Sequence, residues 1–426
     1  MTQSIDTPPR DPRGGDATLD ARQHLLALLG AGLAAVDGRR STREALEARP
    51  IQGSTWICAV GKAAEAMALG AWDALGERPR GGLVITKAGH ADERRLGALG
   101  IETLIGGHPI PDEGSLIAGQ RLRTAIDRTP PETTLLILIS GGASSLLECP
   151  VEGIGLPELA RLNQWLLASG LPIEDMNRVR KSVSRLKAGG LLPVIGARPV
   201  RALAISDVPD DRIAVIGSGL LVPEPDLHDR VGPLALPDWA AAWVSRGLRT
   251  RGTLPPVGPE IELIATLAKA KSAVAVAAKR RGLNVWLHEE TITGDAADLG
   301  RALAQALMGS APGLHIWGGE TTLRLPASPG RGGRNQHLAL AAAIEIAGHA
   351  DCLLLSLGTD GTDGPTEDAG ALVDGHSLER AQLAGCDASA HLARADAGTL
   401  LEASGDLIRT GPTGTNVMDL ILGLKT

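Results

Sequence analysis

A lysine and a glycine-rich turn, each placed directly after a short apolar run, are the first candidates for chemistry. Lys62 follows the run over residues 55–60 and precedes an alanine-rich helical pattern. The turn Ser140-Gly141-Gly142-Ala143-Ser144-Ser145 follows the run over residues 135–139. Backbone N–H groups at a strand-to-helix turn bind anions, so both segments predict phosphate binding. Close packing of small residues and an ordinary surface lysine are the alternatives that the pattern leaves open.

The segment around Lys62 differs from the P-loop of nucleoside triphosphatases. Gly53 and Gly61 are too far apart for that motif, and Ala63 stands where a serine or threonine would bind magnesium. We therefore expect Lys62 to act as a cation beside phosphate at a helix N-terminus.

Two further candidates lie in the N-terminal half of the chain. His108 belongs to a loop stiffened by Pro109 and Pro111, where it could bind an anionic group or position a substrate. Asp207 follows the apolar run over residues 201–205 and could take a hydroxyl proton or hold a metal ion. A loop histidine is often structural, and a turn-forming aspartate has the same sequence pattern, so both alternatives stay open.

A second group of loops in the C-terminal half carries an arginine and several oxygen ligands. Arg334 follows a glycine cluster at the start of a predicted helix that includes residues 338–347, and arginine suits bidentate binding of carboxylate or phosphate. The candidates for binding substrate or phosphate in these loops are Asn335, Glu320, Asp360, Thr413, Thr415 and Asn416. The metal ligands stay open, with Asp207, Glu320 and Asp360 as the candidates.

Short apolar runs alternate with longer helical patterns through most of the chain, which is typical of βαβ units. We expect an α/β fold, with a doubly wound, Rossmann-like parallel sheet first and a second α/β domain after it. The predicted strands are 55–60, 83–86, 135–139, 201–205, 283–287, 315–318 and 352–357. A proline- and glycine-containing break at 252–258 predicts a boundary near 255. The predicted parts are a flexible tail over 1–18 and domains over 19–255 and 256–426.

Composition limits the possible partners and the compartment. The 426 residues, 43% of them hydrophobic, suffice for two domains, and a formal net charge of −7 argues against nucleic acid and anionic membranes as partners. No uninterrupted apolar stretch approaches the roughly 20 residues of a spanning helix, and residues 1–16 lack a signal-peptide core. The four cysteines form no CxxC pair, which favours buried thiols and a cytoplasmic location.

Phenylalanine and tyrosine are both absent, whereas tryptophan occurs 7 times. A chain of this length ordinarily carries on the order of tens of these rings. We therefore hypothesise an engineered sequence with a restricted alphabet, in which leucine and smaller aliphatic residues fill ring positions.

Taken together, the motifs resemble the glycerate 2-kinases, whose C-terminal part is the MOFRL domain. The matching segments are GKA at Lys62, GGHPIPDEGS from Gly106, SGGASSLL from Ser140, ISDV at Asp207, GGET at Glu320, GGRNQ at Arg334, GTDGTDGP from Gly358 and TGPTGTNVMDL from Thr410.

The resemblance implies ATP as phosphoryl donor with Mg²⁺, D-glycerate as acceptor and 2-phosphoglycerate as product, in a monomer or homodimer. It implies active-site roles for Lys62, Asp207 and Arg334. Two positions depart from the family pattern. Leu220 stands where proline normally follows Ser-Gly, and His337 stands where glutamate is usual. The second change is expected to remove or reverse a charge beside Arg334 and to affect substrate affinity.

An NAD(P)H-dependent hydroxypyruvate reductase is the alternative, because residues 30–35 match the pattern GxGxxA. That segment lies in a predicted helix over 25–36, and no clear strand precedes it, as the dinucleotide fingerprint requires. A non-enzymatic sensor of small molecules is the third interpretation. Sensing would not need this combination of lysine, aspartate, arginine and hydroxyl-rich loops.

Overall fold

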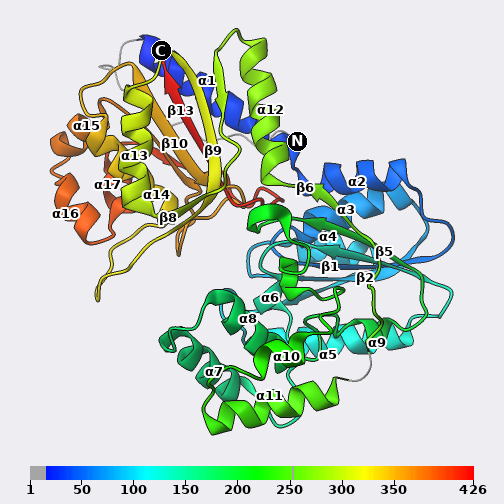
Figure 1. Ribbon diagram of the computed structural model, residues 1–426. Coiled ribbons are helices and arrows are strands. Elements are labelled where there is room, and N and C mark those ends of the chain that lie inside the picture. Colours follow the sequence, from blue (N-terminus) through cyan, green and yellow to red (C-terminus); the bar gives the residue numbers. More distant parts are fainter. Residues whose placement is uncertain (1–15, 252–253) are drawn as a thin grey trace. The chain divides into compact units, whose positions relative to one another are not determined.

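The computed structural model describes residues 16–251 and 254–426 and divides the chain into two compact units (Figure 1). The parallel-sheet unit is Gly38–Ile264. The mixed-sheet unit combines the residues up to Asp37 with Ala265–Thr426. The sequence placed residues 19–37 in the first domain, whereas the structure joins them to the C-terminal part of the chain. Most of the predicted tail over 1–18 lies outside the described residues, and the first helix begins at Asp16.

The parallel-sheet unit contains a six-stranded sheet in the order β3-β2-β1-β4-β5-β6. Its strands are β1 Thr55–Val60, β2 Pro79–Thr86, β3 Ile101–Ile105, β4 Thr134–Ile139, β5 Val200–Ile205 and β6 Ile261–Ala265. Neighbouring strands from β3 to β5 pair in parallel. The central strand β4 reads TLLILI and is buried on both faces, because a covered parallel strand is apolar throughout instead of alternating. The predicted doubly wound sheet is confirmed.

The parallel-sheet unit also contains ten α-helices and two 3₁₀ turns among its described residues. They are α2 Gly38–Ala48, α3 Ala64–Leu75, α4 Glu93–Ala98, α5 Glu113–Arg128, α6 Ala143–Leu146, α7 Leu156–Ala168, α8 Ile173–Ser182, α9 Leu192–Ile195, α10 Leu227–Val231 and α11 Asp238–Thr250, with 3₁₀ turns η1 Pro209–Asp211 and η2 Ile216–Ser218.

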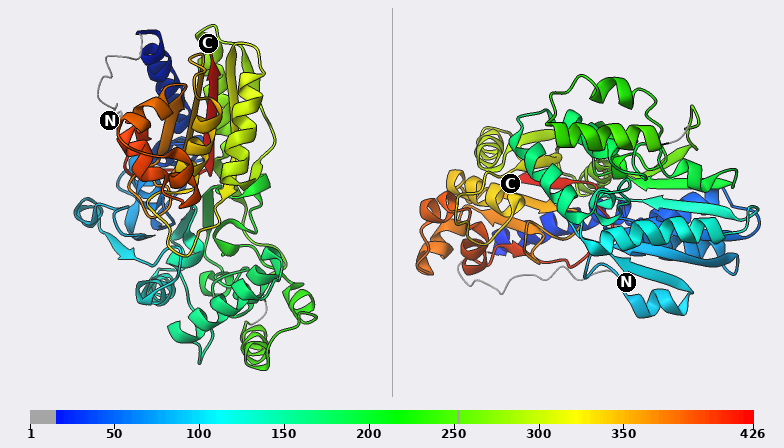
Figure 2. Two further views of the ribbon diagram at one scale, coloured as in Figure 1. Left: turned by 90° about the vertical axis from the view of Figure 1, so that its left-hand side faces the viewer. Right: turned by 90° about the horizontal axis from the view of Figure 1, so that it is seen from below.

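The mixed-sheet unit contains a sheet in the order β12-β11-β10-β13-β9-β7, with β8 also pairing β9. Its strands are β7 Val285–Leu287, β8 Ile292–Asp295, β9 Gly313–Thr322, β10 Cys352–Gly358, β11 Gly370–Asp374, β12 Leu407–Ile408 and β13 Asp419–Lys425. β13 pairs antiparallel with both β10 and β9, whereas β7 and β8 run parallel to β9. In the left view of Figure 2 the red strand β13 lies within this sheet. The alternating pattern predicted the strands but not this mixed pairing.

Helices cover both faces of the mixed sheet (Figure 1). On one face, α1 Asp16–Ala35 packs with α12 Leu267–Arg280 in a core that includes Leu25 and Val274. On the other face, α13 Ala296–Met308 and α14 Arg334–Glu345 pack over Leu354 and Ile421. The remaining helices of the unit are α15 Ser377–Leu383, α16 Ala388–Ala393 and α17 Ala397–Ala403.

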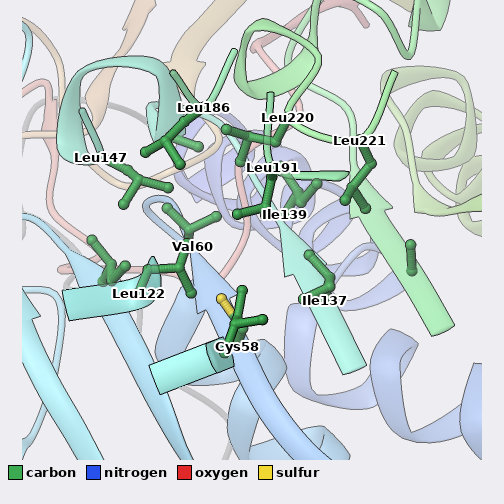
Figure 3. Packing of buried hydrophobic residues seen from close by; sticks show 14 of the residues in the cluster. Cys58, Val60, Leu122, Ile137, Ile139, Leu147, Leu186, Leu191, Leu220 and Leu221 are labelled. Atoms are coloured by element: carbon green, nitrogen blue, oxygen red, sulfur yellow. The ribbon is translucent and has the colours of Figure 1, made fainter. Parts of the chain in front are cut away.

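Aliphatic side chains fill the core of the parallel-sheet unit (Figure 3). Val60 and Ile139 lie there at the ends of adjacent strands, and Leu220 is buried among them with 2% of its surface exposed. The leucine that replaces the family's proline therefore takes part in the core. In the mixed-sheet unit the rings of Trp286, His315 and Trp317 stack, with successive centroids 4.6 and 5.1 Å apart.

All four cysteines are free thiols, and Cys58, Cys149 and Cys352 are buried, as expected from their spacing. Burial raises the pKa of Cys58 to about 12, so this thiol stays protonated and unreactive at neutral pH. No helix in the described part of the chain is both long and apolar enough to cross a membrane.

Candidate active site

Lys62 and the glycine-rich turn meet where the strand order of the parallel sheet reverses. β1 and β4 are neighbours at the centre of the sheet, and their chain connections lead away in opposite directions. Ligands of doubly wound sheets bind beyond the carboxyl ends of the strands at such a point. The Lys62 backbone N–H donates to the Gly141 carbonyl oxygen over 2.8 Å, and the Ala63 N–H donates to Ser140 Oγ over 3.1 Å. The two segments thus form one joined structure.

Two glycines allow this close approach. Gly61 has φ +122°, and a Cβ there would lie 2.2 Å from Ser140 Oγ and 2.5 Å from the Ser140 carbonyl oxygen. Gly142 has φ +84°, and a Cβ there would lie 3.1 Å from His108 Cδ2 and 3.3 Å from Lys62 Cγ. The structure therefore brings Lys62, His108 and the turn together, and phosphate binding by them stays a prediction.

The helix after the turn is shorter than a phosphate-binding helix usually is. α6 has four residues, so its dipole contributes little to anion binding. Ser145 Oγ donates to the Gly142 carbonyl oxygen over 3.3 Å, and the hydroxyls of Ser144 and Ser218 share a hydrogen bond. The Ser145 hydroxyl is therefore already used as a donor, and the glycine backbone rather than a long helix is what this turn offers to an anion.

A buried ion pair that the sequence analysis missed fixes the chain directly after α6. Lys187 Nζ lies 2.5 Å from Glu148 Oε2, and the two residues are 5% and 3% exposed. Ser184 Oγ donates to Glu148 Oε1 over 2.6 Å, and the Cys149 N–H donates to the same oxygen over 2.9 Å. The buried charges are paired and hydrogen-bonded, which burial requires. The sequence signal is a lysine followed by Ala-Gly-Gly.

Asp207 lies at the same carboxyl edge of the parallel sheet. It follows β5, which pairs in parallel with β4 through Ile139 and Ala204. The Asp207 side chain is half-buried and the preceding Ser206 is buried. Its position one strand from the glycine-rich turn fits the predicted role, which stays a prediction.

Arg334 is the first residue of α14 and is held by groups from β9 and β13. Its Nη1 donates to Glu320 Oε1 over 2.6 Å and to the Thr321 carbonyl oxygen over 2.9 Å. Its Nη2 lies 3.8 Å from Asp419 Oδ2. Burial opposes the charge, but the carboxylates of Asp419 and Glu320 raise the pKa of Arg334, so it remains a cation. Glu320 and Arg334 therefore form an ion pair between β9 and the start of α14.

A distant aspartate occupies the N-terminus of α14. Asp363 accepts hydrogen bonds from the backbone N–H groups of Asn335, over 3.0 Å, and Gln336, over 2.8 Å. Gly333 permits this because a Cβ there would lie 2.3 Å from Asp363 Cγ. Burial raises the pKa of Asp363 although these hydrogen bonds oppose the shift. The free donors of this helix therefore bind a protein carboxylate in place of a ligand anion.

Asn335 is 2% exposed and its amide is engaged on all sides. Its Nδ2 donates to Asp419 Oδ1 over 2.9 Å and to Asp363 Oδ1 over 3.4 Å, and its Oδ1 accepts from Ser356 Oγ over 2.6 Å. An asparagine at this position holds the carboxylates of Asp363 and Asp419 in place through its amide hydrogen bonds. Contact of Asn335 with substrate stays a prediction.

The remaining predicted residues lie in interlocked loops at this end of the mixed sheet. Asp360 Oδ1 accepts from the Thr362 N–H over 2.9 Å, and the Thr413 N–H donates to the Asp360 carbonyl oxygen over 3.4 Å. Thr415 and Asn416 are buried at 2% and 7% exposure. The described residues contain no group of three or more His, Cys, Asp or Glu arranged to hold a metal ion.

His337 removes the charge that a glutamate would carry at this position, which is one of the two expected outcomes. It is 6% exposed, and burial lowers the pKa of its ring, so it is neutral at pH 7. The charges that act on it are those of Asp295 and Arg301, on the side of α13. We conclude that the substitution contributes a neutral buried ring.

The segment that matches GxGxxA, residues 30–35, lies entirely within α1. A dinucleotide-binding fingerprint requires a strand, a tight turn and then a helix. Residues 16–35 form one continuous helix, so this match does not provide a pyrophosphate site.

Two family models match this chain, one in its N-terminal part and one in its C-terminal part. Residues 24–233 match a family described as a domain of unknown function, DUF4147, and residues 313–419 match the MOFRL family. A D-glycerate 2-kinase of Thermotoga maritima is 37% identical over 387 residues, covering 86% of this chain and 90% of that protein. An Agrobacterium vitis protein named provisionally as a hydroxypyruvate reductase is 37% identical, covering 94% of each chain.

The crystal structure of a glycerate kinase from Thermotoga maritima shares the fold, with a TM-score of 0.82 and 34% identity over 96% of this chain and 100% of that one. Identity of this level over nearly the whole length of both proteins establishes common descent. The chain belongs to the glycerate 2-kinase family, with a MOFRL domain in its C-terminal part.

Proposed function

We propose that this protein transfers the γ-phosphoryl group of ATP to the 2-hydroxyl of D-glycerate, giving 2-phosphoglycerate and ADP. The observation that carries the proposal is the joined pair of segments at the strand-order reversal, where the Lys62 N–H donates to the Gly141 carbonyl oxygen and the Ala63 N–H donates to Ser140 Oγ. A cation beside a glycine- and hydroxyl-lined turn is suited to phosphate oxygens. The names of the relatives support the same activity.

The reaction breaks the bond between the β,γ-bridging oxygen and the γ-phosphorus and forms a bond from the 2-oxygen of glycerate. Positioning and electrostatics supply most of the acceleration in such transfers. We assign to Lys62 the offsetting of negative charge on the phosphates, and to the turn the binding of anionic oxygens. His108, whose ring lies against Gly142, supports this binding.

We assign to Asp207 the orientation of the 2-hydroxyl and the acceptance of its proton. Arg334 binds the carboxylate of glycerate or the transferring group, since its planar guanidinium matches either anion. Mg²⁺ enters with the nucleotide as part of the substrate and supplies charge neutralisation when bound. Asp207 and Asp360 are protein oxygens proposed to assist it, whereas Glu320, the third candidate, is engaged by Arg334.

The test is ADP formation from Mg-ATP and D-glycerate, with the product identified as 2-phosphoglycerate. Lys62→Ala and Arg334→Ala are each expected to lower kcat/KM by about 10²–10³-fold, the usual effect of removing one electrostatic stabiliser. Lys279→Ala and Arg280→Ala are the matched controls, because both residues are exposed in the last turn of α12. Turnover near the parent value in Lys62→Ala and Arg334→Ala would contradict the assignments.

The same preparation is assayed with NADH and hydroxypyruvate. If NADH is consumed and no ADP forms from Mg-ATP and D-glycerate, the reductase activity is supported and the kinase activity is rejected. Absence of both reactions would favour the sensor.

A further inference from the structure

Arg334 lies between two carboxylates of different character at one end of the mixed sheet. Glu320, on β9, has 48% of its side chain exposed and makes a 2.6 Å contact with Nη1. Asp419, at the start of β13, has 4% of its side chain exposed and lies 3.8 Å from Nη2. An exposed ion pair exchanges readily with water and ligands, whereas a buried carboxylate stays where the fold places it.

Several elements fix Asp419. Its backbone pairs with Gly319 of β9 and Gly358 of β10, and a Cβ at Gly358 would lie 3.7 Å from Asp419 Oδ1. The same oxygen accepts from Asn335, whose amide is held by Asp363 and Ser356. The Asp419 carboxylate therefore cannot follow a moving partner.

The second oxygen of Asp419, Oδ2, lies toward Arg334. Oδ2 is buried and has no hydrogen-bond partner within the described ranges, and it is the oxygen nearer to Arg334. A buried carboxylate oxygen left unsatisfied is rare and calls for a functional explanation. Three charged groups interact electrostatically with the Asp419 carboxyl: Arg334 from α14, Asp363 from the loop after β10 and Glu320 from β9. Arg334 is the cation among them.

We propose that Asp419 is a positioning residue, the fixed counter-ion of Arg334, and that Glu320 is an exchangeable one that an anionic group of the substrate displaces. As substrate binds, the guanidinium leaves Glu320 and keeps Asp419. Glu320 thus competes with substrate, whereas Asp419 assists its binding. This inference rests on the proposed role of Arg334 in the kinase reaction.

The two carboxylates are distinguished by the sign of their effect on KM for D-glycerate. Glu320→Gln removes the competitor and is expected to lower KM about threefold or more. The assay is run at about pH 8, above the pKa of about 7 to which burial raises Asp419, so that this carboxylate is charged. Asp419→Asn then leaves Glu320 as the carboxylate in contact with Arg334 and is expected to raise KM about tenfold. A nonspecific effect of deleting negative charge near an anion site would lower KM in both variants. Asp298→Asn, whose side chain is 76% exposed on α13, is the charge-matched control and is expected to leave KM unchanged.

Folding is checked by thermal unfolding of each variant. Ser356→Ala gives a second approach to Asp419, because it removes only the hydroxyl that orients the Asn335 amide; KM is again expected to rise. A KM that falls or stays constant in Asp419→Asn, or in Ser356→Ala where the first variant does not fold, overturns the inference. So does a raised KM in Glu320→Gln. If the parent protein forms no ADP, the proposed function is overturned instead. The dissociation constant for D-glycerate is then measured by calorimetry, and it is expected to fall in Glu320→Gln and to rise in Asp419→Asn.

Discussion

Replacing Gly61 with alanine tests the joined segments at the strand-order reversal. Gly61 has φ +122°, and the new Cβ would lie 2.5 Å from the Ser140 carbonyl oxygen and 2.2 Å from its Oγ. Backbone in this region costs an L-residue about 1–3 kcal/mol, and forcing an extra carbon into packed structure costs about 1–3 kcal/mol more. We therefore expect the free energy of unfolding of the parallel-sheet unit to fall by about 2–6 kcal/mol.

Gly53→Ala separates the two contributions. Gly53 has φ +80° but no atom within 4 Å of the added Cβ, so this variant carries the backbone cost alone, about 1–2 kcal/mol. Urea unfolding followed by far-UV circular dichroism compares the two proteins, and ADP formation is measured alongside. Equal stability of Gly61→Ala and Gly53→Ala would show that the contact with Ser140 is not close, and would refute the reasoning.

Three further outcomes follow from other residues. Lys187→Met leaves the Glu148 charge buried without its cation, so urea unfolding should show a loss of about 3–5 kcal/mol, with a smaller loss when Glu148→Gln is added. Burial raises the pKa of Asp419 from 3.8 to about 7, so the folded state holds a proton that the unfolded state releases, and stability falls as pH rises across that interval. Asp419→Asn removes this dependence: its stability relative to the parent should be higher at about pH 8 than at about pH 5, and a constant difference would contradict the shift. Gly30→Ala, inside α1 with no atom within 4 Å, should raise the unfolding free energy by about 0.5–1 kcal/mol in thermal denaturation, and a loss would contradict the open position.

Strands and the polar residues at their ends were predictable because both are local patterns. Thr55–Val60 has the predicted bounds, and Lys62 and the Ser140 turn follow their strands as the sequence indicated. Parallel pairing of the first sheet follows from the same rhythm, since a helix between successive strands returns the chain in the same direction.

The rest depends on contacts between residues far apart in the chain. Nothing near Gly333 indicates that Asp363 caps α14, and nothing near Glu148 indicates Lys187 as its partner. The antiparallel position of β13 between β9 and β10 is set by strand pairing, which hydrophobic periodicity does not specify. The role of His337 likewise depends on which face of α14 is buried.

The place of α1 has a consequence for synthesis on the ribosome. Leu25, Leu28 and Leu29 are fully buried, and their cluster includes Val274 of α12, which is translated roughly 250 residues later. At about 5–20 residues per second, the apolar face of the nascent α1 waits on the order of 10–50 s for its partner helix, while the whole parallel-sheet unit emerges and folds. During that interval the buried leucines of α1 lack the helix that covers them in the folded protein.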